Sequence, residues 1–276
     1  MDIISTIPEL RARLAKEASI AFVPTMGNLH AGHISLINLA QQRGDCVVAS
    51  IFVNPLQFGP NEDLASYPRT LQDDCEKLQV AGCDVVFTPD EATLYPQPQD
   101  VRIALPEIAD QLSGAVRPGH FHGVATVVLK LFNIVQPQVA VFGKKDFQQL
   151  HIIRHMVEQL ALDAEILAGE TVRESDGLAM SSRNSYLKPA ERVEAPRLYK
   201  ALQQVVQAIQ GGQRGFAAIE TQTTQYLTQL GWQVDYIAVR SATTLQSPLA
   251  RERELVVLGA ARLGKTRLID NLTFMI

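Results

Sequence analysis

Short apolar runs alternate with amphipathic stretches through the first two-thirds of the chain. Apolar runs separated by helical patterns are typical of parallel strands that are buried on both faces of a sheet. We expect strands at 20–23, 46–53, 84–88 and 138–142, and helices near 34–42, 71–81 and 124–135. This pattern predicts a Rossmann-like α/β domain, in which ligands bind at the carboxyl ends of the strands.

The pattern changes around residues 171–176. Beyond that point, helical patterns at 192–210 and 216–230 flank a Gly-rich loop, and strand-like runs follow at 234–240, 254–261 and 267–273. These runs predict a smaller α+β domain with an antiparallel sheet. We therefore expect two domains, 1–171 and 172–276, with the boundary near Val172.

Composition narrows the class of protein. The 276 residues are 46% hydrophobic, which is enough for a substantial core, and the net charge of −4 argues against nucleic acid as the main partner. The three cysteines, Cys46, Cys75 and Cys83, form no C-x-x-C pair, which favours a reduced, cytoplasmic setting. We expect no membrane association, because the N-terminus lacks a secretion signal and no apolar run reaches about 18 residues.

The most informative segment is PTMGNLHAGH at residues 24–33, between the first strand and the following helix. The free N–H groups and the dipole of a helix N-terminus attract anions, and two imidazoles can donate hydrogen bonds to phosphate oxygens. We interpret His30 and His33 as part of a nucleotide phosphate site, with catalysis at the α-phosphate. A structural or metal-binding pair is the alternative, but no Cys, Asp or Glu stands nearby at the spacing of a zinc site.

A second polar group follows the next strand, in FVNPLQFG at residues 52–59. Asn54 and Gln57 can hydrogen-bond a neutral polar substrate, and Leu56 and Phe58 can wall it off. A Pro-containing loop with polar tips is the alternative.

The segment VFGKKDFQQL at 141–150 also follows a strand. Gly143 allows close backbone approach, and Lys144 and Lys145 offer cations to phosphates. Asp146 can orient a ribose hydroxyl or a lysine, and Gln149 lies about one helical turn farther on. The alternative is a solvated pair of lysines.

The segment AMSSRN at 179–184 lies beyond the domain boundary. The hydroxyls of Ser181 and Ser182 and the guanidinium of Arg183 suit the β- and γ-phosphates of a nucleotide. This segment is either a closing lid or a plain polar loop.

Three weaker signals remain. Residues 259–266 match the Walker A string, but a strand-like run follows it, so we interpret Gly264 as a hairpin turn. Arg117 and His120, in a Gly-flanked loop, either contact an anion or shape a turn. Asp73 and Asp74 either begin a helix, which we favour, or bind Mg²⁺.

Taken together, these segments resemble the pantothenate synthetase (pantoate–β-alanine ligase) family. The matching segments, in the family's order, are PTMGNLHAGH, SIFVNPLQFGPNEDLASYPRT, RPGHFHGVATVV, VFGKKDFQQL, MSSRN and GAARLGKTRLIDN. The histidine and Ser-Ser-Arg segments are also similar to the signature pair of class I aminoacyl-tRNA synthetases and nucleotidyltransferases.

The resemblance implies a reaction in two steps. The carboxylate of (R)-pantoate attacks the α-phosphate of ATP to give pantoyl-adenylate, and the amine of β-alanine then displaces AMP to give pantothenate. The resemblance further implies a need for Mg²⁺, a homodimer formed through the N-terminal domain, and a cytoplasmic location.

Residue roles follow from matching positions. The resemblance implies that His33 is the catalytic acid and His30 a phosphate partner, and that Lys145 neutralises charge as pyrophosphate leaves. Gln57 would hold pantoate and approach β-alanine, and Gln149 would hold pantoate. Asn54 is a further candidate for substrate binding. The ATP site would comprise Met26, Gly27, Asn28, Leu29, His30, Ala31, Gly32, His33, Gly143, Lys144, Lys145, Asp146, Val172, Met180, Ser181, Ser182 and Arg183.

Two other functions remain possible on the residues alone. A nucleotidyltransferase would leave AMP on its product, and a nucleotide sensor would bind ATP without turnover. Gln57 and Gln149 favour the ligase, because they imply a small polar acid as co-substrate.

Overall fold

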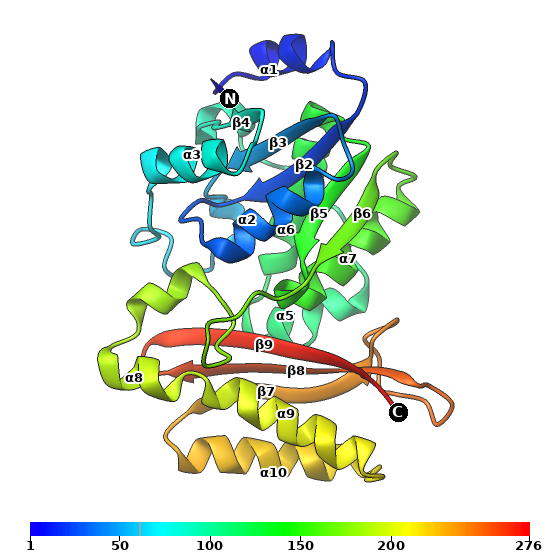
Figure 1. Ribbon diagram of the computed structural model, residues 1–276. Helices are drawn as coiled ribbons and strands as arrows, with labels where there is room; N and C mark the ends of the chain where they lie inside the picture. The colour runs from blue at the N-terminus through cyan, green and yellow to red at the C-terminus, as the bar shows by residue number, and fades with distance from the viewer. Residues whose placement is uncertain (61) are drawn as a thin grey trace.

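Two separate sheets organise the structure, a computed structural model that describes residues 1–60 and 62–276. The larger sheet has six parallel strands in the order β1-β4-β3-β2-β5-β6, and the smaller has three antiparallel strands in the order β7-β8-β9 (Figure 1). The predicted combination of a Rossmann-like α/β part and a smaller α+β part is therefore confirmed.

All strand pairs of the larger sheet are parallel. The strands are β1 (Asp2–Ile4), β2 (Ile20–Thr25), β3 (Cys46–Ile51), β4 (Val85–Phe87), β5 (Val139–Gly143) and β6 (Glu165–Gly169). The four predicted strands are confirmed, with shifted ends. The two edge strands, β1 and β6, were not predicted, because one is only three residues long and the other is only partly buried.

Helices cover both faces of this sheet. The helices are α1 (Ile7–Leu14), α2 (Ala31–Ala40), α3 (Leu71–Val80), α4 (Glu91–Leu94), α5 (Ser113–Val116), α6 (His120–Val135) and α7 (Phe147–Gln159). Residues of α2 and α3 pack on one face, and residues of α1, α6 and α7 pack on the other. Successive strand residues such as Phe22 and Val23 belong to different clusters, as the period of two in a strand requires.

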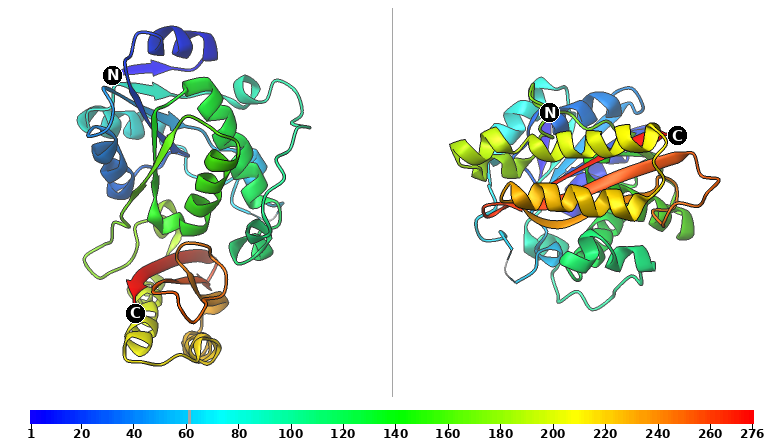
Figure 2. Two further views of the ribbon diagram at one scale, coloured as in Figure 1. Left: turned by 90° about the vertical axis from the view of Figure 1, so that its right-hand side faces the viewer. Right: turned by 90° about the horizontal axis from the view of Figure 1, so that it is seen from below.

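The C-terminal part packs two long helices on one face of the small sheet (Figure 2). Its elements are α8 (Pro189–Glu194), α9 (Arg197–Gln210), α10 (Phe216–Gln229), β7 (Gln233–Ser241), β8 (Glu254–Leu263) and β9 (Thr266–Met275). The predicted single helix at 192–210 is wrong, because α8 ends at Glu194 and α9 begins at Arg197. Pro196 stands between them and has no backbone N–H to continue the first helix.

A smaller apolar cluster joins the two parts. Ile108, Phe121 and Ile152 of the N-terminal part pack with Val256 and Leu258 of β8. The small sheet thus lies between its own helices and the N-terminal part of the chain (Figure 1).

The predicted hairpin at residues 259–266 is confirmed. These residues form the end of β8, a turn and the start of β9, and Gly264 has a φ of +58° in that turn. The Walker A geometry of a strand, a loop and a helix is absent from this described segment. None of the helices in the described ranges, 1–60 and 62–276, has the length and apolar character needed to cross a bilayer.

Candidate active site

A cavity of about 230 Å³ opens at the carboxyl ends of β2, β3, β5 and β6. This is the edge at which open parallel sheets bind ligands. The predicted site residues that line the cavity are Met26, His30, Gly32, His33, Asn54, Gln57, Gly143, Lys145, Asp146, Gln149, Val172, Met180, Ser181, Ser182 and Arg183. All four predicted motifs therefore meet in one place.

The histidine turn, residues 24–33, carries two imidazoles side by side, with ring centroids 4.0 Å apart. Helix α2 begins three residues earlier than predicted, so His30 is its N-cap and His33 lies in its first turn. His30 Nδ1 accepts a hydrogen bond from the Gly32 N–H (3.1 Å), and His33 Nδ1 accepts one from the His30 N–H (3.2 Å). Because each Nδ1 is an acceptor, each ring carries its proton on Nε2.

Burial keeps both rings neutral. It lowers the pKa of His30 to about 3, with help from neighbouring His33 and Lys145, and it lowers the pKa of His33 to about 4, with help from Lys145. At neutral pH the turn therefore presents two neutral N–H donors.

A buried carboxylate fixes the backbone of the turn. Asp74, on α3, accepts hydrogen bonds from the N–H groups of Asn28 (2.8 Å) and Leu29 (2.7 Å) and from the Thr70 hydroxyl (3.0 Å). A Cβ atom on Gly27, whose φ is +83°, would lie only 3.0 Å from this carboxylate. The carboxylate is thus committed to the turn, and Asp73 is exposed, which fits the helix-start interpretation of these two residues.

Asn54 holds Gln57 in the cavity wall. Its amide donates to Gln57 Oε1 and to the Gly123 carbonyl, both at 3.1 Å, and its own Oδ1 accepts from the Tyr95 hydroxyl (2.9 Å). Both of its N–H groups are therefore used inside the protein. Gln57 Nε2 lies 3.0 Å from the Met26 sulfur.

Only one of the two predicted apolar walls is in place. Phe58 lines the cavity, whereas Leu56 is 41% exposed and lies outside the lining. The expectation that Leu56 walls off the substrate was therefore wrong.

Arg117 and His120 brace the backbone of the same turn. His120 Nδ1 lies 2.8 Å from the Gln57 carbonyl oxygen and Arg117 Nη1 lies 2.9 Å from His120 Nε2. Since Arg donates to Nε2, His120 donates from Nδ1, and burial together with Arg117 lowers its pKa to about 4. Both side chains also reach the cavity, and Arg117 forms an ion pair with Glu62.

The two lysines after β5 differ in position. Lys145 lines the cavity, with its Nζ 3.7 Å from a carboxylate oxygen of Asp146. Lys144 forms an ion pair with Glu170 and lies outside the lining. Partial enclosure opposes ionisation of Asp146, but the charges of Lys145 and Arg183 hold the pKa of its carboxyl below the usual range.

Asn271 of β9 fastens this loop from the C-terminal part. Its buried amide donates to the carbonyl oxygens of Lys144 and Lys145, both at 2.9 Å. The neighbouring Asp270 forms a two-point ion pair with Arg173. The loop that carries Lys144 and Lys145 is therefore positioned by a residue more than a hundred positions away.

The Ser-Ser-Arg loop, residues 181–183, leans against the histidine turn. The Ser182 hydroxyl donates to the Asn28 carbonyl (3.1 Å), and the Asn28 amide donates to the Ser182 carbonyl (3.3 Å). Arg183 makes a two-point ion pair with Asp63, at 3.0 and 2.9 Å.

Five of the residues predicted to bind the nucleotide do not line the cavity. Gly27, Asn28, Leu29, Ala31 and Lys144 are absent from the described lining. Leu29 is buried in the core and Ala31 is exposed.

The roles of Asp63, Asp74, Tyr95 and Asn271 were missed in the sequence. The one available signal was the adjacent polar pair Asp270 and Asn271, inside a run otherwise suited to a strand.

Comparison with known proteins agrees with the resemblance seen in the sequence. A family model described as Pantoate-beta-alanine ligase matches residues 2–273. A pantothenate synthetase of Methylobacillus flagellatus is 63% identical over 276 residues, which is 100% of this chain and 99% of that protein. One from Nitrosospira multiformis is 58% identical over 272 residues, covering 99% of this chain and 98% of that protein.

Two solved structures extend this agreement to the fold. Pantothenate synthetase from Thermus thermophilus has a TM-score of 0.94 and 44% identity, with 99% of each chain covered. The pantoate-beta-alanine ligase of Francisella tularensis, solved with beta-gamma ATP and beta-alanine, has a TM-score of 0.84 and 36% identity, covering 99% of this chain and 97% of that one. The chain described here therefore belongs to the pantoate–β-alanine ligase family.

Proposed function

We propose that this chain joins (R)-pantoate to β-alanine in two steps, with ATP as the activating substrate. In the first step a pantoate carboxylate oxygen attacks the α-phosphorus of ATP, the bond to the β-phosphate oxygen breaks, and diphosphate leaves. In the second step the free amine of β-alanine attacks the pantoyl carbonyl, AMP leaves with the electron pair of the C–O bond, and the nitrogen releases one proton to solvent to give the amide. The observation that carries this proposal is a pair of neutral imidazole donors in one cavity with the amides of Gln57 and Gln149.

The phosphate side of the site is built from donors of two kinds. The Nε2–H groups of His30 and His33 supply neutral donors, and Lys145 and Arg183 supply positive charge. Preorganised donors of this kind stabilise the charge that moves onto the departing diphosphate without a costly reorganisation of water. In support, the Francisella ligase was solved with beta-gamma ATP. The remaining ATP contacts proposed are Met26, Gly27, Asn28, Leu29, Ala31, Gly32, Gly143, Asp146, Val172, Met180, Ser181 and Ser182.

We assign His33 the role of a hydrogen-bond donor at the reacting phosphate. A general acid must be protonated at working pH, and in the ligand-free protein burial lowers the pKa of His33 to about 4, which favours the neutral imidazole over the imidazolium that such an acid needs. Adenylation needs no such proton, because both the attacking carboxylate and the departing diphosphate are anions. The family resemblance implies the role of catalytic acid for the same residue, and that role stays a prediction.

The organic substrates are proposed to occupy the part of the cavity near Gln57 and Gln149. Two neutral amides suit the hydroxyl and carboxylate groups of pantoate, and Met26 and Phe58 border the same space with apolar atoms. Asn54 contributes by fixing Gln57, whose Oε1 it holds. Lys144 is given a minor part, because it is engaged with Glu170.

Mg²⁺ is proposed to accompany the triphosphate. Mg²⁺ in such sites is usually held by one or two carboxylates together with substrate phosphates, and Asp146 offers an ionised carboxylate on the cavity wall. When bound, the ion would neutralise phosphate charge. Removal of Mg²⁺ with a chelator should abolish AMP formation, and Asp146→Asn should raise the Mg²⁺ concentration needed for half-maximal rate.

The domain limits 1–171 and 172–276, a homodimer formed through the N-terminal domain and a cytoplasmic location are also proposed. The two separate sheets support the domain division, whereas the dimer and the location rest on the family resemblance. Light scattering on the purified chain tests the dimer, with a mass near twice 30.4 kDa expected.

The deciding experiment is pantoate-dependent exchange of labelled diphosphate into ATP, with Mg²⁺ and without β-alanine. Exchange would demonstrate a reversible adenylate. Pantothenate formation without exchange would exclude a freely reversible first step before β-alanine binds. A stable adenylylated product would indicate a nucleotidyltransferase, and ATP binding without AMP formation would indicate a sensor.

A further inference from the structure

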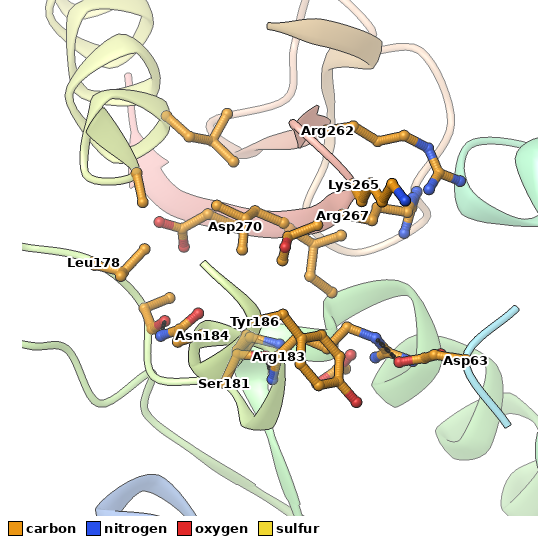
Figure 3. Close-up of a pocket in the computed structure, with 18 of the residues that line it drawn as sticks. Asp63, Leu178, Ser181, Arg183, Asn184, Tyr186, Arg262, Lys265, Arg267 and Asp270 are labelled. Carbon is orange, nitrogen blue, oxygen red and sulfur yellow. Dashed lines mark hydrogen bonds and ion pairs between the residues drawn. The ribbon is translucent and has the colours of Figure 1, made fainter. Parts of the chain in front are cut away.

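A second cavity, of about 380 Å³, adjoins the nucleotide cavity on the side of the C-terminal sheet. The two cavities share the side chains of Arg117, Lys145, Asp146, Ser181 and Arg183. Figure 3 shows the second cavity between the β8–β9 hairpin and the Ser-Ser-Arg loop. A cavity of this size is in the range that holds small ligands.

Most charges on its walls are already paired. Arg117 is paired with Glu62, Arg183 with Asp63, and Lys145 lies near Asp146. Two further wall residues are paired with partners outside the lining, Arg267 with Asp235 and Asp270 with Arg173.

Two cations are left over. Arg262 and Lys265, on the hairpin, make no ion pair and no side-chain hydrogen bond with the residues that the structure describes. Arg262 is also half-buried, so its charge has lost part of its hydration without gaining an anion in return. With the paired groups cancelled, the cavity carries the charge of two free cations, which favours an anionic ligand.

We propose that this second cavity receives the diphosphate after it leaves the adenylate. The proposal rests on the proposed function, which makes diphosphate at the junction where Ser181 and Arg183 face both cavities. Arg262 and Lys265 would hold the anion farther from the new adenylate, and Asp63 could then pair with Arg183 again. The cavity thus serves product release, whereas ATP is bound by the first cavity.

The test replaces the two free cations by neutral side chains of similar length, in the variant Arg262→Gln/Lys265→Gln. Binding of Mg·diphosphate is measured by isothermal titration calorimetry, and half-saturation by diphosphate is measured in the exchange reaction. We expect the dissociation constant of Mg·diphosphate and the half-saturating concentration of diphosphate each to rise about tenfold, because hydrogen bonds from charged groups contribute more than those from neutral groups. The KM for ATP should change less than twofold.

Two matched variants control for charge and folding. Arg251→Gln/Arg253→Gln removes the same charge from the opposite end of β8, outside the cavity, and should leave diphosphate binding unchanged. Arg262→Lys/Lys265→Arg keeps both charges and should retain binding within about threefold. Thermal unfolding shows whether each variant is folded.

Three outcomes would overturn the proposal. Equal weakening of ATP and diphosphate binding would place the two cations in the nucleotide site itself. Unchanged binding of both ATP and diphosphate would mean that the cavity binds no anion. An equal effect of the Arg251→Gln/Arg253→Gln control would mean that the weaker binding comes only from the change in the net charge of the protein. Failure of the proposed function is recognised separately, because wild-type protein would then form no AMP while the titration still reports on the cavity.

Discussion

The histidine turn and the Ser-Ser-Arg loop face the same cavity but are held in place by different forces. The turn is fixed by neutral hydrogen bonds between imidazoles and backbone, and by the buried Asp74 carboxylate beneath it. The loop leans on the turn through the Ser182 and Asn28 hydrogen bonds, and its charged residue, Arg183, is held by Asp63, which lines the second cavity and is only partly buried.

This difference suits the histidine turn and the Ser-Ser-Arg loop to different tasks in the same site. A turn held by buried backbone hydrogen bonds keeps its donors in position before the substrate arrives, which is what electrostatic preorganisation requires. A partly exposed ion pair contributes little stability and can be exchanged for a phosphate. The turn should therefore govern the rate of chemistry, and the loop should govern the affinity for phosphate groups.

The largest effect should come from the turn. His33→Ala removes a preorganised donor, and we expect kcat for pantothenate formation to fall by about 10²–10³ with little change in KM for ATP. Steady-state kinetics on the folded variant measure this loss. His155→Ala, on α7 and outside the cavity lining, is the control. A fall of only a few-fold for His33→Ala would remove this histidine from the chemical step.

The neutral histidines should also make stability depend on pH. The folded pKa values of His30, His33 and His120, about 3, 4 and 4, lie below the ordinary value of 6.5. Below pH 6.5 these histidines bind protons in the unfolded chain but stay neutral in the folded chain. The free energy of unfolding should therefore be highest above pH 6.5 and should decrease as the pH falls toward 4. At pH 5 each of these histidines should lower the free energy of unfolding by about 2 kcal/mol relative to neutral pH.

Urea unfolding at pH 7.5, 6 and 5 measures this dependence. Between pH 7.5 and pH 5, the free energy of unfolding should decrease less in the His120→Asn variant than in the wild type. The difference between the two decreases should be about 2 kcal/mol. Parallel curves for the two proteins would mean that His120 becomes protonated in the folded state at an ordinary pH.

Much of this site could be read from local sequence, because its main parts follow the ends of parallel strands. Gln57, Lys145 and the two histidines stand just beyond apolar runs, and the topology of the sheet brings such positions to one edge. The fold class follows from the same alternation of buried strands and helices.

The unpredicted parts depend on distant partners. Asp74 serves the turn from a helix 45 residues away, and in the sequence it looks like any acidic residue in a first helical turn. Asn271 contacts a loop more than a hundred residues earlier, and Asp63 meets Arg183 only in the folded chain. Edge strands β1 and β6 were missed for a different reason, because an edge strand needs only a weak apolar pattern.

A smaller effect should come from the contact of Asn271 with the carbonyl oxygens of Lys144 and Lys145, which joins the two parts of the chain. Asn271→Ala leaves the carbonyls of Lys144 and Lys145 without their donor, so Lys145 loses its fixed position. We expect kcat/KM for ATP to fall about thirtyfold, because two hydrogen bonds of about 1 kcal/mol each are lost. Thr273→Ala, at an exposed position on the same strand, is the control. A loss of thermal stability with unchanged kcat/KM would mean that Asn271 serves the fold alone.

The smallest effect should come from the ion pair between Arg183 and Asp63. Whether the KM for ATP rises or falls when this pair is removed is more informative than the size of the change. Asp63→Asn removes the anion that competes with phosphate for Arg183, so the KM for ATP should fall about threefold while kcat changes little. The difference from wild type should shrink at high salt, because the pair is partly exposed. Asp176→Asn, which breaks the surface pair with Arg192, controls for the loss of one negative charge. A rise in KM would give Asp63 the opposite role, that of aiming Arg183 at the phosphates, and the loop would then be as preorganised as the turn.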